Sequence, residues 1–175
     1  MLDKAKMTIA EVNALSDAAF VNQFGFLFEH TPWIVEATAG LRPFATVTDM
    51  FLTLIFVFDD AGPELQLDLV RAHPKLADKA AIAAGLTRES AAEQASAGLD
   101  ALTPEEFARF HALNDAYEKR FGFPFIICVR RAGGKAGILA AMADRLDNPD
   151  ITEFAMALQE VGKIVKLRLE DKVAA

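Results

Sequence analysis

Residues 103–129 read TPEEFARFHALNDAYEKRFGFPFIICV, a helix pattern followed directly by an apolar run. The first four residues form a capping box with Pro104 at the first helical position, which is typical of a helix start. The side chains that follow at helical spacing and are expected to face the core are Phe107, Phe110, Leu113, Asn114 and Tyr117. This half of the stretch therefore predicts a helix with one buried side.

The second half, Phe121–Val129, contains no polar residue and is rich in aromatic and β-branched side chains. Such a composition favours extended backbone. A lone strand among helices has no ladder partner, so its N–H and C=O groups must bind side chains, water or a ligand. A conflict between local preference and fold class is often found at functional sites, and we expect this segment to take part in function.

Most of the remaining chain shows helical periodicity and further helix-start signals. These signals predict helices that begin after Ser16, at Thr31-Pro32, after Thr46 and at Pro63, and a last helix from about Asp150 to Glu170. Leu52 and Phe56 add apolar residues to a helix that already has an apolar face, so we expect that helix to be buried on most sides. The predicted fold is all-α: a single compact domain, residues 1–175, of about seven to nine helices with one short extended segment.

The composition limits the classes of function. The chain has 175 residues, 53% of them hydrophobic, and a net charge of −7, so nucleic acid and anionic membrane surfaces are poor partners. Its longest uncharged run, Ala18–Phe28, is shorter than the roughly 20 residues of a membrane span. The N-terminus lacks the apolar region of a signal peptide. We expect a cytoplasmic protein that binds neither nucleic acid nor membranes.

Three histidines are candidates for acid–base chemistry, although a lone histidine is more often structural. His111 lies within a predicted helix and His30 precedes one, so structural roles explain both. His73 differs because it lies at a helix end fixed by Pro74, which disfavours helical backbone in the residue before it. The negative end of the helix dipole favours a protonated imidazole there, which suits a proton donor.

The segment Ser90–Gln94 admits two interpretations. Ser-x-x-Glu is a capping box, and helix capping alone would explain Ser90 and Glu93. Alternatively, a helix start that presents N–H groups, a hydroxyl, a carboxylate and an amide could hold a small polar molecule. Cys128 lies in an apolar run, so we expect a buried, inert thiol. No metal-ligand spacing is present, and we expect neither a metal site nor a cofactor.

The order and spacing of several motifs are more specific than any of them alone. They are Phe28–Trp33, Arg42–Phe44, Ala72–Ala77, Leu86–Gln94, Phe110–Tyr117, Lys119–Val129, Arg145–Asn148 and Lys163–Leu169. Together they closely resemble the OHCU decarboxylase family, enzymes of purine catabolism that act on 2-oxo-4-hydroxy-4-carboxy-5-ureidoimidazoline. The resemblance runs from about Leu15 to Leu169, which is nearly the whole chain.

The resemblance implies an all-helical homodimer that produces (S)-allantoin and CO2 without a cofactor. It places the proton donor on His73 and a second catalytic group on Glu93. The residues that it assigns to binding of the small ureide substrate are Pro74, Ser90, Ala91, Ala92, Gln94, Phe125, Ile126, Ile127, Cys128, Val129 and Arg168. Arg145 is an alternative to Arg168 for the substrate carboxylate, because the alignment is not fixed across the Gly133-Gly134 loop. Lys75, where many members carry an acidic residue, should change only the local charge.

Two other classes of function remain open at this point. One is a helical module that binds a small polar metabolite without catalysis, or a divergent enzyme with a changed substrate. The other is a structural interaction protein, which would leave His73, Glu93 and the Phe125–Val129 backbone without a shared purpose. Formation of (S)-allantoin from freshly generated substrate distinguishes the decarboxylase from both.

Overall fold

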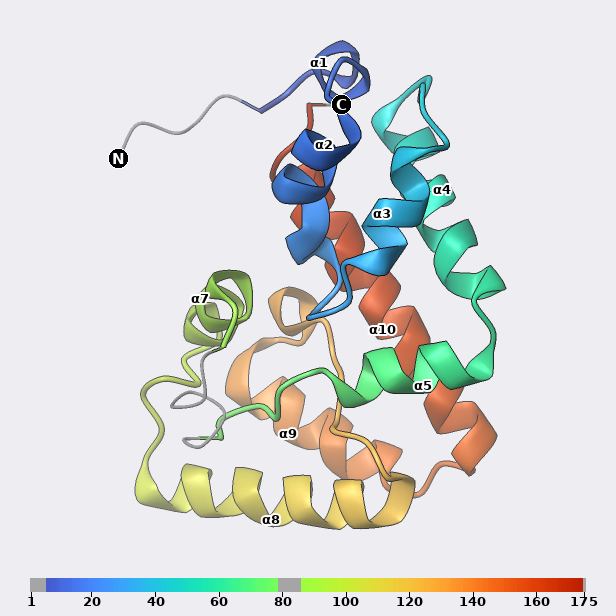
Figure 1. Ribbon diagram of the computed structural model, residues 1–175. Coiled ribbons are helices and arrows are strands. Elements are labelled where there is room, and N and C mark those ends of the chain that lie inside the picture. Colours follow the sequence, from blue (N-terminus) through green and yellow to red (C-terminus); the bar gives the residue numbers. More distant parts are fainter. Residues whose placement is uncertain (1–5, 79–85, 175) are drawn as a thin grey trace. The chain divides into compact units, whose positions relative to one another are not determined.

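Helices form nearly all the regular structure of this chain, as Figure 1 shows. The structure is a computed structural model that describes residues 6–78 and 86–174. The described residues form nine α-helices and two short 3-10 helices, with no sheet, which confirms the predicted all-α fold. Within these residues no helix is both long enough and apolar enough to cross a membrane.

The helices begin and end close to the predicted positions, and Figure 1 labels them. The α-helices are α1 (Ile9–Asn13), α2 (Asp17–Phe24), α3 (Trp33–Ala39), α4 (Val47–Asp60), α5 (Pro63–Arg71), α7 (Arg88–Ser96), α8 (Pro104–Phe121), α9 (Gly134–Arg145) and α10 (Asp150–Glu170). The 3-10 helices are η1 (Gly25–Leu27) and η2 (Val129–Arg131). The chain divides into two compact units, Met1–Leu69 with Gly162–Ala175 (unit 1) and Val70–Val161 (unit 2).

Unit 1 is built around aromatic side chains of its first helices. Ser16 caps α2 as predicted, accepting from the Ala19 N–H at 3.2 Å. The rings of Phe20 and Phe24 lie 5.1 Å apart, and those of Phe28 and Phe58 5.8 Å apart. Such ring pairs add to the free energy that burial of their apolar area contributes.

Two predictions for unit 1 are wrong in detail. Thr31 does not cap α3: its hydroxyl donates to the Glu29 carbonyl at 2.8 Å, and the helix begins at Trp33. Helix α4 is not buried on most sides, because Leu52 is 58% exposed and Phe56 64% exposed. Since α4 is apolar on nearly every face, periodicity could not indicate which face the neighbouring helices would leave uncovered.

In unit 2, helix α8 follows the predicted pattern. Thr103 and Glu106 form the capping box, and Phe110, Asn114 and Tyr117 are buried on one face. Gly122 ends the helix in the left-handed conformation, with φ of 76°, which glycine adopts without steric cost. The chain beyond it has no helix and no strand pairing until η2, which confirms a short non-helical segment. Phe121 and Val129, which were predicted to belong to this segment, lie instead in α8 and η2.

Candidate functional site

His73 lies in a turn at the end of α5. The helix ends at Arg71, and the His73 N–H donates to the Val70 carbonyl at 3.3 Å, closing the last turn. The His73 side chain is half-buried at the helix C-terminus, where the dipole favours a cation. His30 and His111, in contrast, have side chains that are 58% and 62% exposed, which fits their structural interpretation.

The turn that follows His73 is bound to two helices of unit 2. The Ala77 N–H donates to Gln94 Oε1 on α7 at 3.0 Å, and Asn114 Nδ2 on α8 donates to the Leu76 carbonyl at 2.8 Å. Lys75 pairs with Glu118 on α8 at 2.6 Å, and this hydrogen bond raises the pKa of Lys75. Gln94 therefore joins the His73 turn to the helix that carries Glu93.

The capping interpretation of Ser90 and Glu93 is wrong. Thr87 is the N-cap of α7, and its hydroxyl accepts from the Ser90 N–H at 3.2 Å. Ser90 thus lies at the third helical position, and Glu93 lies in the middle of the helix. Ser90 and Gln94 are buried and Glu93 is half-buried, whereas Ala91 and Ala92 are exposed on another side of α7. Capping no longer accounts for the Glu93 carboxylate.

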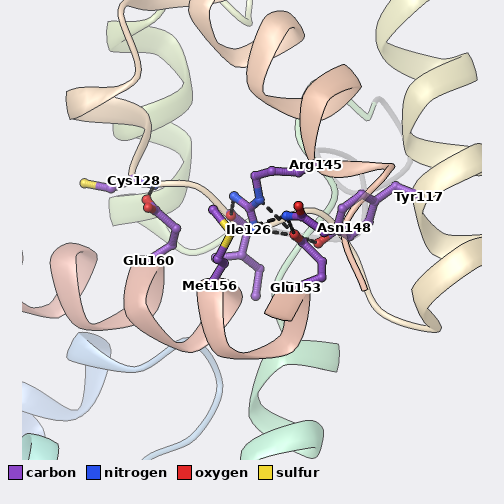
Figure 2. A network of polar contacts seen from close by, with 8 residues as sticks. All are labelled: Tyr117, Ile126, Cys128, Arg145, Asn148, Glu153, Met156 and Glu160. Atoms are coloured by element: carbon purple, nitrogen blue, oxygen red, sulfur yellow. Dashed lines mark hydrogen bonds and ion pairs between the residues drawn. The ribbon is translucent and has the colours of Figure 1, made fainter. Parts of the chain in front are cut away.

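Side chains of the protein bind part of the Phe125–Val129 backbone. Arg145 Nη1 donates to the Ile126 carbonyl at 2.9 Å, and the Cys128 N–H donates to Glu160 Oε2 at 2.7 Å (Figure 2). The Cys128 carbonyl accepts from the Arg131 N–H at 2.8 Å as η2 begins. A lone extended segment was expected to need hydrogen-bond partners for its backbone. At Ile126 and Cys128 these partners come from α9, α10 and the following turn.

A buried polar network underlies this segment, as Figure 2 shows. Arg145 Nε and Nη2 donate to Glu153 Oε1 at 2.9 and 2.5 Å, and the Tyr117 hydroxyl donates to the same oxygen. Asn148 Nδ2 donates to Glu153 Oε2 at 2.7 Å. The Arg145 guanidinium also lies 4.4 Å from the centre of the Phe125 ring. Nη1 of Arg145 therefore binds the segment, while its Nε and Nη2 bind Glu153 on α10.

Burial shifts the ionisation of two groups near this network. The pKa of Tyr117 is raised, first because the ring is buried and second because its hydroxyl donates to Glu153. The pKa of the Cys128 thiol is raised by burial and, to a smaller extent, by the carboxylates of Glu160 and Glu93. Cys128 is 2% exposed and forms no disulfide, so the predicted burial of this thiol is confirmed.

Unit 2 gathers the predicted site residues except Arg168. Gln94 binds the His73 turn, α7 packs against η2, and Glu93 is close enough to influence Cys128. In addition, Arg71 Nε donates to the Gly122 carbonyl at 3.2 Å, which joins the end of α5 to the start of the extended segment. Arg168 belongs to unit 1, where it is 4% exposed and its Nη1 donates to the Phe26 carbonyl at 3.0 Å and to Glu29 at 3.3 Å.

Sequence reasoning missed the supporting residues of this site. Glu153 lies on the buried face of α10, four residues before Ala157 and eight before Val161. A carboxylate on an otherwise apolar face was the sequence signal that could have identified this residue. Asn114 interrupts the apolar face of α8 in the same way. Glu160 gave no such signal. Over the described ranges 6–78 and 86–174, no group of three or more His, Cys, Asp or Glu side chains could hold a metal ion.

Comparison with known proteins identifies the family. The chain matches the profile of the family described as OHCU decarboxylase over residues 13–170. It is 41% identical to the 2-oxo-4-hydroxy-4-carboxy-5-ureidoimidazoline decarboxylase of Haloferax volcanii, covering 97% of this chain and 98% of the relative. It is 37% identical to the uric acid degradation bifunctional protein PucL of Bacillus subtilis, covering 94% of this chain and 32% of that protein.

A solved structure agrees with these relatives. The crystal structure of an (S)-allantoin synthase superimposes on this chain with a TM-score of 0.74 at 27% identity, covering 95% of this chain and 54% of that one. The family match and the close relative from Haloferax both extend over nearly the full chain and so include both compact units. This chain therefore belongs to the OHCU decarboxylase family and is a carboxy-lyase.

Proposed function

We propose that this enzyme converts 2-oxo-4-hydroxy-4-carboxy-5-ureidoimidazoline to (S)-allantoin and CO2 in urate degradation, with His73 as proton donor and Glu93 as second catalytic group. The observation that carries the proposal is the hydrogen bond between the Ala77 N–H and Gln94, which joins the His73 turn to the helix that bears Glu93. The substrate comes from the names of the relatives, and the roles of the residues come from the resemblance of their motifs.

The reaction needs a proton delivered to one side of a planar carbon. Cleavage of the bond between C4 and the carboxylate releases CO2 and moves the electron pair into the neighbouring C=N bond, whose nitrogen takes up a proton. The C4 hydroxyl then loses its proton and becomes a carbonyl, while C5 receives a proton from His73. A donor fixed on one side of the ring sets the handedness of the product. The ring itself accepts the electron pair, so the proposal includes no cofactor.

Directional binding of the substrate follows from the polar groups of unit 2. We assign the ureido and ring-amide groups to the backbone of Phe125–Val129. The other residues that we assign to substrate binding are Pro74 and, on α7, Ser90, Ala91, Ala92 and Gln94. The support is that protein side chains bind this backbone at two points, Arg145 at Ile126 and Glu160 at Cys128. Backbone donors and acceptors that are fixed in this way recognise a flat polar ring at little cost in ordering.

For the substrate carboxylate the proposal keeps the assignment that the resemblance gives, which is Arg168 with Arg145 as the alternative. Nε, Nη1 and Nη2 of Arg145 donate to Glu153 or to the Ile126 carbonyl, and Nη1 of Arg168 donates to the Phe26 carbonyl and to Glu29. Each guanidinium is therefore buried beside a carboxylate, and neither can leave it without exposing an unpaired charge.

We also propose a homodimer in the cytoplasm. Leu52 and Phe56 lie four residues apart on α4 and are the most exposed apolar side chains of that helix, at 58% and 64%. Neighbouring apolar side chains exposed on one helix are a common feature of interfaces between identical chains. A reducing compartment suits the single unpaired thiol of Cys128.

The test uses freshly generated substrate and circular dichroism to follow (S)-allantoin. The wild-type chain should form (S)-allantoin faster than the uncatalysed reaction, and chelator should leave the rate unchanged. His73→Gln should lose at least roughly 10²-fold in turnover, the usual size of a general acid–base contribution, with its helicity intact. His111→Gln is the matched control and should retain full turnover, because that side chain is exposed on α8. A fully active His73→Gln variant would remove the proposed donor.

A further inference from the structure

We propose that Asn114 is a positioning residue for His73, acting through the peptide group between Leu76 and Ala77. The inference rests on the proposed role of His73 as proton donor. Asn114 lies on α8, outside the motifs assigned to the substrate, and it is 6% exposed. Its Nδ2 donates to the Leu76 carbonyl, so the effect that we propose passes through the turn after His73.

One peptide group is held from both ends. The Leu76 carbonyl and the Ala77 N–H belong to the same planar unit. Asn114 Nδ2 donates to that carbonyl at 2.8 Å, and Gln94 Oε1 accepts from that N–H at 3.0 Å. Both side chains are 6% exposed, so water competes little for either bond. The plane of this peptide is therefore fixed by α8 on one side and α7 on the other.

The turn needs such a restraint. Ala77 has φ of 57°, in the left-handed region that residues other than glycine rarely adopt. A residue persists there only when its surroundings determine its conformation. Because only Pro74 and Lys75 lie between His73 and the clamped peptide, the orientation of that peptide limits how the chain leaves Pro74 and so where the imidazole points.

The hydrogen bonding of Asn114 is poorly suited to stability alone. Among the described residues its Oδ1 is buried without a hydrogen-bond partner. A buried, half-satisfied amide costs free energy of folding, whereas an apolar residue of similar size would avoid that cost. The hydrogen bond that Nδ2 does make is directed at the Leu76 carbonyl of the His73 turn, which points to a role in placing that turn.

The test compares Asn114→Ala with Asn13→Ala. Asn13 is a matched control because its amide also clamps a loop in unit 1: Nδ2 donates to the Phe44 carbonyl at 2.8 Å and Oδ1 accepts from the Phe44 N–H at 2.9 Å. Both variants should lower the melting temperature. Asn114→Ala should also lower kcat roughly 10- to 100-fold with little change in KM, as a misplaced catalytic group does. Asn13→Ala should leave kcat unchanged.

Two further variants separate positioning from simple loss of stability. Asn114→Asp removes the donor, and its kcat relative to the wild type should recover as pH falls, because a protonated carboxyl can donate to Leu76 again. Adding Ala77→Gly to Asn114→Ala should restore part of kcat, since glycine adopts this φ without strain. If Asn114→Ala melts at a lower temperature yet keeps its kcat, or if neither further variant restores activity, the inference is overturned.

A second readout does not depend on turnover. The His73 imidazole resonances and the hydrogen exchange of the Ala77 amide should change in Asn114→Ala and remain as in the wild type in Asn13→Ala. Unchanged signals in Asn114→Ala would overturn the clamp even if the enzyme were active. If instead the wild-type chain forms no (S)-allantoin while these signals respond as expected, the clamp stands and the proposed function fails.

Discussion

At the scale of single residues, the position of the α7 cap bears on the choice between two roles for Glu93, helix capping and catalysis. Thr87 caps the helix, so Glu93 has no capping duty. We expect Glu93→Gln, which keeps the shape and one acceptor oxygen, to lose roughly 10²-fold or more in turnover, as removal of a catalytic carboxylate does. Its melting temperature should stay close to that of the wild type. Steady-state kinetics and thermal unfolding on the same preparation check both expectations.

The control for Glu93 is the cap itself. Thr87→Ala removes the oxygen that accepts from the Ser90 N–H and should cost about 1 kcal/mol of unfolding free energy, the usual value for a cap. It should retain most of its turnover. If Glu93→Gln behaves in the same way, destabilised but active, the carboxylate has a structural role only.

The cap of α7 also marks a limit of sequence reasoning. Thr87 and Ser90 are both hydroxyl residues at the start of the same helix, three positions apart. Judged by sequence alone, Ser90 with Glu93 matches the capping-box pattern better than Thr87 with Ser90. The helix nevertheless begins one turn earlier, after Thr87. Local rules rank both positions as caps, and the choice depends on which residues of α7 the rest of unit 2 buries, such as Ser90 and Gln94.

At the scale of elements, the extended segment before η2 allows a backbone test. Ile127→Pro removes one N–H and should weaken binding of (S)-allantoin if that N–H faces the ligand, as we propose. Ile127→Leu keeps the backbone and should cost less than about 1.5 kcal/mol of stability and little affinity. Calorimetric titration of both variants with (S)-allantoin measures the difference. Equal affinity in Ile127→Pro and Ile127→Leu would contradict the assignment of this N–H.

The sequence was sufficient for elements that carry strong local signals. Helix α8 begins at its capping box and α10 spans Asp150–Glu170, both as predicted. The extended character of the segment after Gly122 was also predictable from its composition. Its partners were not, since Arg145 lies 19 residues from Ile126 and Glu160 lies 32 residues from Cys128. Contacts over such separations depend on how helices pack, which no local pattern encodes.

At the scale of the whole molecule, stability should fall in alkaline solution. The folded protein holds the Tyr117 pKa above its ordinary value of about 10. Above pH 10 the unfolded chain therefore loses a proton that the folded chain keeps, so unfolding becomes easier by about 1.4 kcal/mol per pH unit. Below pH 10 neither state is ionised at this residue, and the full contribution is present.

Denaturant unfolding between pH 8 and 11 measures this dependence. Tyr117→Phe should flatten the decline, because phenylalanine has no proton to lose. Part of the decline should remain, since the raised pKa of Lys75 acts in the same direction and Lys75 is partly exposed. A variant and a wild type with identical slopes above pH 10 would show that the folded protein does not raise the pKa of Tyr117.

The proposed dimer gives a second prediction at this scale. Phe56→Glu places a charge on the exposed apolar side of α4 and should produce a monomer with unchanged helicity. Thr53→Glu is a suitable control on the same helix, because its side chain is half-buried and polar already. Sedimentation velocity distinguishes the two states. A wild-type chain that sediments as a monomer would disprove the dimer, and a dimeric Phe56→Glu variant would place its interface elsewhere.

The single cysteine gives the enzyme an internal reporter. Cys128 is 2% exposed, its thiol is held protonated by a raised pKa, and its N–H is bound to Glu160. A thiol reagent can therefore modify it only during excursions in which the segment around it separates from α10. The rate of labelling measures how often those excursions occur. Binding of a ligand at the substrate site should slow the labelling, so a residue already present in the chain reports whether that site is occupied.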